Sequence, residues 1–222
     1  MIADATPEEL HELQIGETPT LAAVLGLPAM RKGLVIFAHG SGSSRKSPRN
    51  TYVAGRLREA GLATLLLDLL TPEEELHRRN VFDIGLLASR LRRATDWAAS
   101  DPLTSSLRPC YFGASTGAGA ALLAAAGDPR IAAIVSRGGR PDLAGERVLA
   151  QVTAPTLLLV GGLDDVVIEL NEAARDAMRC ESQLVIVPGA THLFEEPGTL
   201  DQVVDHAGTW FLEHLPPVDP RR

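Results

Sequence analysis

The sequence has few cysteines, few aromatic residues and no long apolar stretch. Only 2 of its 222 residues are cysteine, and 4% are aromatic. Cys110 and Cys180 lie outside any CxxC or Cys/His ligand pattern, which excludes a disulfide framework and a zinc module. No apolar stretch approaches the roughly 20 residues that a membrane-spanning helix needs. We therefore expect a protein with no bound metal and no membrane partner.

Positive charge is also scarce, because 21 Lys and Arg face 28 Asp and Glu, for a net charge of −7. An acidic chain repels the phosphates of DNA and RNA, so we expect no nucleic-acid partner. The first ten residues lack the basic start and the apolar core of a secretory signal. These features predict a cytoplasmic protein.

The composition is that of an ordinary globular protein, 45% hydrophobic and 22% charged. The length fits one domain over residues 1–222, and we expect residues 1–10 and 216–222 to be flexible ends. Short apolar segments alternate with longer ones in which apolar residues recur every three or four positions. Strands are predicted at 34–38, 63–68, 110–112, 131–135, 156–160 and 184–187, helices at 51–60, 80–99, 118–126, 167–177 and 200–211, and an edge hairpin within 11–28. This alternation predicts an α/β fold with a mostly parallel central sheet and helices on both faces.

The most informative motif is Gly113-Ala114-Ser115-Thr116-Gly117, which follows a predicted strand and opens a predicted helix. In this context G-x-S-x-G predicts a nucleophilic serine held on a strained strand-to-helix turn. Glycines flank the turn because side chains at those positions would collide with neighbouring backbone. The alternative is a serine that only caps the helix, which is a common use of serine.

A base and an acid follow Ser115 in the order that this motif requires. Asp164 and His192 each come directly after one of the last two predicted strands. Since the carboxyl ends of parallel strands share one edge of the sheet, all three side chains are expected to meet there. Taken singly, the aspartate fits a turn residue and the histidine a surface residue, and Asp165 and Glu195 are rival acids. Together the three predict a catalytic triad of Ser115, Asp164 and His192.

A glycine-rich loop, His39-Gly40-Ser41-Gly42, follows the first predicted strand of the parallel sheet. A serine enzyme that transfers acyl groups stabilises a tetrahedral oxyanion, and backbone N–H groups do this without reorganising. We predict the N–H of Thr116 as one donor and the N–H of Ser41 as the other, with Gly42 as the alternative to Ser41. A phosphate-binding loop is the competing interpretation, but neither G-x-G-x-x-G nor GxxxxGK[ST] is present.

Arginines in the neighbouring loops are candidates for binding substrate. Arg45 follows the glycine-rich loop, and Arg137 and Arg140 follow the predicted strand 131–135. With His39 and Gly42 they form the possible substrate-binding set, which would suit an acidic acyl compound. The alternative is that these arginines are solvated or paired with nearby acids. Only about twenty residues separate this strand from the next, which predicts a minimal or absent cap domain.

These motifs resemble the α/β-hydrolase superfamily, and within it small members that are similar to dienelactone hydrolase. The resemblance extends from about residue 34 to residue 212. The stretch 39–50 is also similar to domains of this kind that are fused to phosphoribosyltransferases. The resemblance implies the α/β-hydrolase fold and the triad. Dienelactone hydrolases proper carry cysteine at the position of Ser115, so it does not imply dienelactone as the substrate.

The sequence therefore predicts a serine hydrolase that cleaves small esters, lactones or thioesters through an acyl-enzyme intermediate. The expected partner is a small-molecule substrate, with no cofactor and no metal. The alternative is a non-catalytic binding module with the same fold. Neither the oligomeric state nor the identity of the acyl group follows from the residues.

Overall fold

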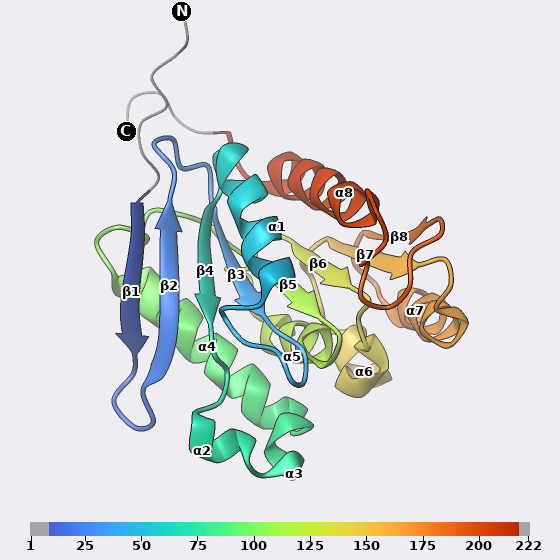
Figure 1. Cartoon of the computed structure of the whole chain (residues 1–222), viewed down its shortest axis with the longest axis horizontal. Coiled ribbons are helices and arrows are strands. Elements are labelled where there is room, and N and C mark those ends of the chain that lie inside the picture. The colour runs from blue at the N-terminus through green and yellow to red at the C-terminus, as the bar shows by residue number, and fades with distance from the viewer. Residues whose placement is uncertain (1–8, 218–222) are drawn as a thin grey trace, which may run out of the picture.

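In the described part of the chain, residues 9–217, eight strands form one sheet in the order β1-β2-β4-β3-β5-β6-β7-β8 (Figure 1). In this computed structural model the strands are β1 Glu9–Ile15, β2 Leu21–Leu27, β3 Leu34–Ala38, β4 Ala63–Leu67, β5 Pro109–Ala114, β6 Ile134–Arg137, β7 Thr156–Gly161 and β8 Ser182–Val187. Strands β4, β3, β5, β6, β7 and β8 run parallel, and β1 and β2 add an antiparallel hairpin at one edge. The predicted parallel sheet and edge hairpin are both confirmed.

Helices cover both faces of this sheet, as predicted. They are α1 Pro48–Glu59, α2 Pro72–Glu75, α3 Arg78–Val81, α4 Ile84–Ser100, α5 Thr116–Ala125, α6 Glu146–Leu149, α7 Asp165–Ala177 and α8 Thr199–His214, with a short 3-10 helix, η1, at Pro141–Ala144. Figure 1 shows α1 and α8 in front of the sheet and α4, α5 and α7 behind it. Each face of the sheet therefore carries its own hydrophobic core.

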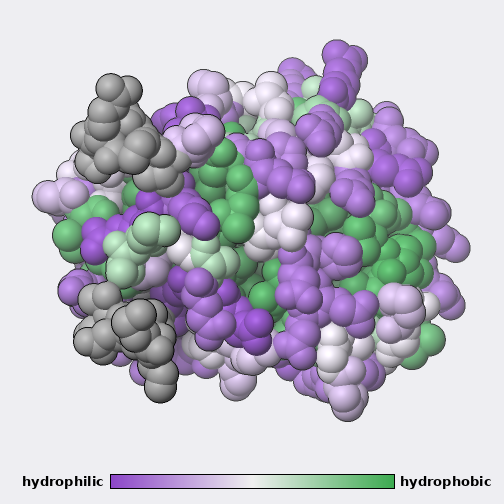
Figure 2. Space-filling view, turned by 90° about the horizontal axis from the view of Figure 1, so that it is seen from above, coloured by the Kyte–Doolittle hydropathy of each residue, from purple (hydrophilic) through white to green (hydrophobic). Residues whose placement is uncertain are grey.

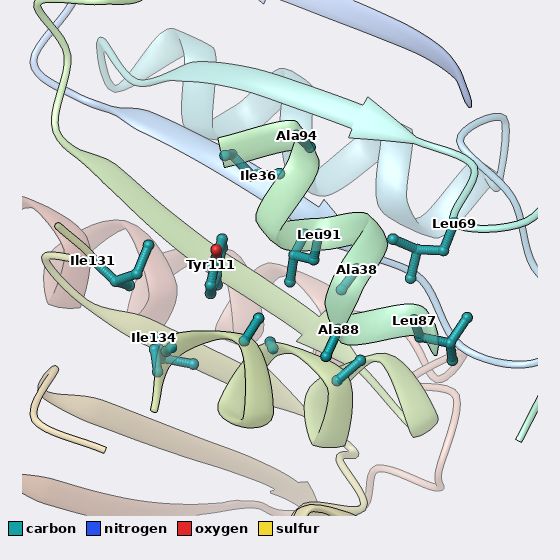
Figure 3. Packing of buried hydrophobic residues seen from close by; sticks show 14 of the residues in the cluster. Ile36, Ala38, Leu69, Leu87, Ala88, Leu91, Ala94, Tyr111, Ile131 and Ile134 are labelled. Atoms are coloured by element: carbon teal, nitrogen blue, oxygen red, sulfur yellow. The ribbon is translucent and has the colours of Figure 1, made fainter. Parts of the chain in front are cut away.

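The central strands are apolar throughout because helices cover both of their faces. All residues of β3 and β4 are buried. Behind the sheet, Leu91 of α4 lies in one cluster with Ile36 of β3 and Tyr111 of β5 (Figure 3). In front of it, the rings of Phe37 and Phe112 pack with their centroids 4.9 Å apart. This packing fixes the strands whose carboxyl ends carry the candidate site.

Several predicted boundaries differ from the structure by two to four residues, and two of these differences have a clear physical cause. The helix predicted at 80–99 is divided into α3 and α4, because the Asp83 carboxylate caps α4 by accepting a hydrogen bond from the N–H of Leu86 at 2.9 Å. The strand predicted at 131–135 begins only at Ile134. Ile131 still belongs to the preceding turn, since its N–H donates to the carbonyl of Asp128.

The connection between β6 and β7 contains only η1 and α6, which confirms the prediction of a minimal cap. Of the predicted flexible ends, residues 1–8 and 218–222 lie outside the described residues, whereas β1 already begins at Glu9. On the face seen in Figure 2, hydrophobic residues lie in separate patches among hydrophilic ones. Within residues 9–217, no helix combines the length and the apolar character needed to cross a membrane.

Candidate active site

Ser115 lies on a sharp turn between β5 and α5. Its φ of 50° and ψ of −122° are angles that residues with a side chain rarely adopt. Close approach leaves room only for glycine on either side. A side chain at Gly117 would lie 2.1 Å from the carbonyl oxygen of Ala38, and one at Gly113 would lie 2.5 Å from the Cα of Ala118. The spacing of G-x-S-x-G is therefore a steric requirement of the turn.

The serine does not serve as a helix cap. Although Ser115 directly precedes α5, its hydroxyl makes no capping hydrogen bond to the helix. A strained backbone is retained where the surroundings hold it in place, and such positions cluster at functional sites. The alternative interpretation of Ser115 as a structural cap therefore has no support in its contacts.

His192 and Asp164 are in direct contact, with Nδ1 of the histidine 2.6 Å from Oδ2 of the aspartate. Asp164 directly precedes α7, yet its carboxylate points to His192 and makes no capping hydrogen bond to that helix. An ionised carboxylate only accepts hydrogen bonds, so the shared proton belongs to Nδ1 and leaves the Nε2 lone pair available to a second partner. The side chain of His192 is 38% exposed, which leaves it accessible to a substrate.

The two loops that carry this pair are tied together by the backbone. The N–H of Gly162 donates to the carbonyl of Val187 at 2.8 Å, and the N–H of Leu163 donates to the carbonyl of Ala190 at 2.9 Å. These hydrogen bonds hold the aspartate and histidine loops together, which keeps the short contact in place.

The two rival acids have other surroundings. Asp165 is exposed as the first residue of α7. Glu195 forms an ion pair with Arg49 at 2.7 Å. Of the three acids considered from the sequence, Asp164 is the one that contacts His192.

The segment after β6 brings the serine and histidine loops together. The N–H of Ser115 donates to the carbonyl of Arg137 at 3.3 Å. A side chain on the next residue, Gly138, would lie 2.9 Å from the carbonyl oxygen of His192 and 3.6 Å from its Cε1. Within the described residues the Ser115 hydroxyl is not yet hydrogen-bonded to His192, and such bonds often tighten only when substrate is present.

The glycine-rich loop lies over the turn, and its histidine holds it in shape. His39 is buried, with Nδ1 3.0 Å from the carbonyl oxygen of Gly40, and its Nε2 accepts a hydrogen bond from the N–H of Leu69 at 3.1 Å. Both ring nitrogens are thereby engaged by backbone, so His39 supports the loop. Gly42, with a φ of 69°, occupies the bend of the turn, and the N–H of Ser43 donates back to the carbonyl of Gly40.

The two predicted oxyanion donors are neighbours, but one of them already has a partner. The N–H of Ser41 donates to the Thr116 hydroxyl oxygen at 3.0 Å. The N–H of Thr116 is the first of α5 and has no acceptor within the helix. The assignment of Ser41 and Thr116 as oxyanion donors therefore stays a prediction.

Two of the three candidate arginines are paired with acids. Arg45 forms an ion pair with Asp68, and Arg140 grips Asp142 with two hydrogen bonds of 2.7 and 2.8 Å. For these two the structure favours the alternative of local pairing. Arg137 differs from them because it is buried and pairs with no acid among residues 9–217.

Arg137 is 7% exposed, and within residues 9–217 it has no acidic partner. Its Nη1 is buried without a hydrogen bond, and its guanidinium lies 6.0 Å from the ring centroid of Phe112. Burial, together with the charge of Arg49, lowers the pKa of Arg137 to about 10, so the side chain stays protonated at neutral pH. Burying a cation without a counter-ion costs free energy. Arg137 ends β6 and pairs in the sheet with Ala114 of β5, the residue before Ser115.

Sequence reasoning missed two polar contacts at the site. The first is the hydroxyl of Thr116, which accepts from the N–H of Ser41, whereas the sequence predicts a role only for its backbone N–H. The second is Asn171, which is fully buried on α7 and donates from Nδ2 to the carbonyl of Gly139 at 3.0 Å, holding the segment after β6. A polar residue on the apolar face of a predicted helix, four positions after Val167, was the available signal.

Comparison with known proteins finds relatives among curated proteins and among solved structures. No family model matches the sequence. Two curated proteins of Mycobacterium tuberculosis that carry the name phosphoribosyl transferase are 61% identical over 208 residues, or 92% of this chain. The chain spans 46% of the length of each, so it matches about half of these longer proteins.

Among solved structures, an α/β serine hydrolase without a lid from Xanthomonas campestris is 22% identical, with a TM-score of 0.77 over 96% of this chain and 99% of that one. Est1E from Butyrivibrio proteoclasticus is 19% identical, with a TM-score of 0.78 over 91% and 98%. These two show the fold. A dienelactone hydrolase from Anabaena variabilis is 53% identical, with a TM-score of 0.90 over 94% of this chain and 99% of that one. On this likeness, which extends over almost the whole of both chains, the protein belongs to the dienelactone hydrolase family within the α/β-hydrolase fold.

Proposed function

We propose that this protein is a serine hydrolase that cleaves small esters, lactones or thioesters through a triad of Ser115, His192 and Asp164. The observation that carries the proposal is the 2.6 Å contact between His192 and Asp164, together with a strained serine whose hydroxyl makes no capping hydrogen bond to the helix that it precedes. Membership of the dienelactone hydrolase family supports the same class of reaction.

The proposed reaction has two halves. The Ser115 oxygen attacks the acyl carbonyl carbon while Nε2 of His192 takes the serine proton, and Asp164 stabilises the imidazolium that forms. Collapse of the tetrahedral intermediate breaks the bond to the leaving group, which receives that proton from His192. Water then attacks the acyl-enzyme and gives its proton to the same nitrogen, and the acid product leaves as Ser115 regains its proton.

Arg137 narrows the class of substrate within this proposal. Its guanidinium is charged and buried, and no acid among residues 9–217 pairs with it, while Arg45 and Arg140 are neutralised by aspartates. A carboxylate on the substrate would supply the missing counter-ion for this charge. We infer that the preferred substrates carry a negative charge near the acyl group.

Covalent labelling tests the proposed nucleophile. We expect the folded protein to react with a fluorophosphonate probe at a ratio of one to one, because the probe phosphonylates an activated serine and expels fluoride. Peptide mapping by mass spectrometry should place the adduct on Ser115. A folded protein that stays unlabelled, and that hydrolyses none of a panel of p-nitrophenyl esters and lactones, would instead favour the non-catalytic binding module.

Replacing Arg137 with methionine tests the inferred charge preference. The change removes the cation and keeps an apolar side chain of similar length, so kcat/KM for a carboxylate-bearing ester should fall about 10- to 100-fold, as expected for a lost charged hydrogen bond. The value for a neutral ester of the same size should change by less than about threefold. The stability should hold or rise, since the unpaired buried cation is gone.

The Arg140→Met variant is the comparison for this experiment, because that arginine is paired with Asp142. It should affect the charged and the neutral ester to the same extent. Equal effects of Arg137→Met on both esters would remove the preference for anions while leaving the proposed triad intact.

A further inference from the structure

The contact between Ser41 and Thr116 bears directly on how the oxyanion is held, provided that the proposed hydrolase function is right. In this fold one donor is expected from the residue after the nucleophile and another from the glycine-rich loop. The loop donor, the N–H of Ser41, points at the Thr116 hydroxyl oxygen, 3.0 Å away. An N–H aimed at a protein acceptor is not aimed at a substrate oxygen.

The loop has little freedom to turn this N–H elsewhere. His39 pins it on both sides, as it contacts the carbonyl of Gly40 and accepts from the N–H of Leu69. The backbone packs against the serine turn, since a side chain at Gly40 would lie 2.9 Å from the Cβ of Ser115. A side chain at Gly117 would also meet the carbonyl oxygen of His39, at 2.5 Å. The direction of the Ser41 amide is therefore set by contacts that do not depend on substrate.

The Thr116 hydroxyl, in contrast, can still donate a hydrogen bond. Its oxygen accepts the hydrogen bond from Ser41, and a hydroxyl can accept and donate at the same time. Within residues 9–217 its own proton has no acceptor, although the residue is only 4% exposed. A hydroxyl whose oxygen accepts from an amide is polarised and becomes a better donor.

We propose that the hydroxyl of Thr116 is itself an oxyanion donor, so that the amide of Ser41 acts through it and not directly on the substrate. One residue then supplies two donors, its backbone N–H at the start of α5 and its side-chain O–H. The Ser41 amide holds the oxygen of that hydroxyl in place before the substrate arrives. Such preorganised donors are the ones that stabilise a transition state, because they cost no rearrangement during the reaction.

The Thr116→Val variant tests this role, because valine has the shape of threonine and keeps the backbone N–H. Loss of one oxyanion donor is expected to lower kcat by roughly 100-fold, with KM changed by less than about threefold. Binding of a boronic acid, which forms a tetrahedral adduct with Ser115, should weaken by a similar factor. Thr116→Ser retains the hydroxyl and should keep kcat within about threefold of the parent value.

The outcomes separate this proposal from a purely structural role and from the proposed function. If Thr116 only braces the loop, Thr116→Val should lower the melting temperature or raise KM while leaving boronate affinity unchanged, which would overturn the proposal. A faster Thr116→Val enzyme would overturn it too, because the hydroxyl would then be blocking the Ser41 amide. Thr116→Ala gives a second test should the valine variant fold poorly, with the same losses expected. If the parent protein hydrolyses no ester, the proposed function falls first, and this inference falls with it.

Discussion

Replacing Ser115 with alanine is expected to lower kcat for ester hydrolysis by about 10⁴-fold or more, because the variant has no atom that can form the acyl-enzyme. Whatever rate remains would come from the oxyanion donors and substrate binding alone. Substrate affinity should hold, since the proposed role of the hydroxyl is in forming the covalent bond rather than in binding the substrate. Steady-state kinetics on p-nitrophenyl acetate, together with loss of fluorophosphonate labelling, provides the measurement.

The same variant should fold as well as the parent protein. Alanine meets the same positive φ as serine and removes no structural contact, so the free energy of unfolding should change by no more than about 0.5 kcal/mol. Ser106→Ala, at an exposed serine before β5, is the matched control and should change neither activity nor stability. A Ser115→Ala enzyme that retains even a tenth of the parent activity would refute the proposed nucleophile.

Replacing Asp164 with asparagine is expected to lower kcat by roughly 10³- to 10⁴-fold. The amide has nearly the same shape, but it can donate to the histidine and so favour the tautomer with the proton on Nε2. That tautomer cannot accept the proton of Ser115, and the imidazolium also loses its neighbouring negative charge. Initial rates and a pH profile of kcat, compared with those of the parent protein, measure the effect.

The adjacent Asp165 offers a control one residue away. Asp165→Asn removes the same charge at the exposed start of α7, where an acid contributes about 0.3–1 kcal/mol through the helix dipole. Its kcat should stay within about threefold of the parent value, with a small loss of stability by urea denaturation. Equal losses of activity in the two variants would mean that general electrostatics, rather than the contact with His192, accounts for the effect.

Much of the fold could be predicted because two patterns can be recognised in short stretches of sequence: the continuous apolar segments of the strands and the three- to four-residue apolar spacing of the helices. The central strands lie among apolar residues covered on both faces, so β3 and β4 appear as short continuous apolar segments. The apolar pattern does not reveal the helix start near residue 84. Asp83 caps α4 there, although the three- to four-residue spacing of apolar residues begins before it and continues after it. Local capping chemistry overrides a hydrophobic pattern without altering it.

Within the site, the order of residues was informative and the pairing of side chains was not. Ser115, Asp164 and His192 each follow a strand, and parallel strands place their carboxyl ends together. The partners of the arginines depend on side chains distant in sequence or in an irregular segment, as with Arg45 and Asp68. No spacing rule reports such a contact, nor the one between the Ser41 amide and the Thr116 hydroxyl.

The short connection between β6 and β7 has a consequence for the choice of acyl chain. With only η1 and α6 in that connection, no lid has to be displaced, so the rate should rise smoothly with ester concentration and show no jump when micelles form. Methylene groups beyond the first few carbons would stay in water rather than gain the roughly 0.8 kcal/mol each that full burial provides. Selectivity for acyl length should therefore be shallow, and discrimination among substrates is left to the groups nearest the reacting carbonyl.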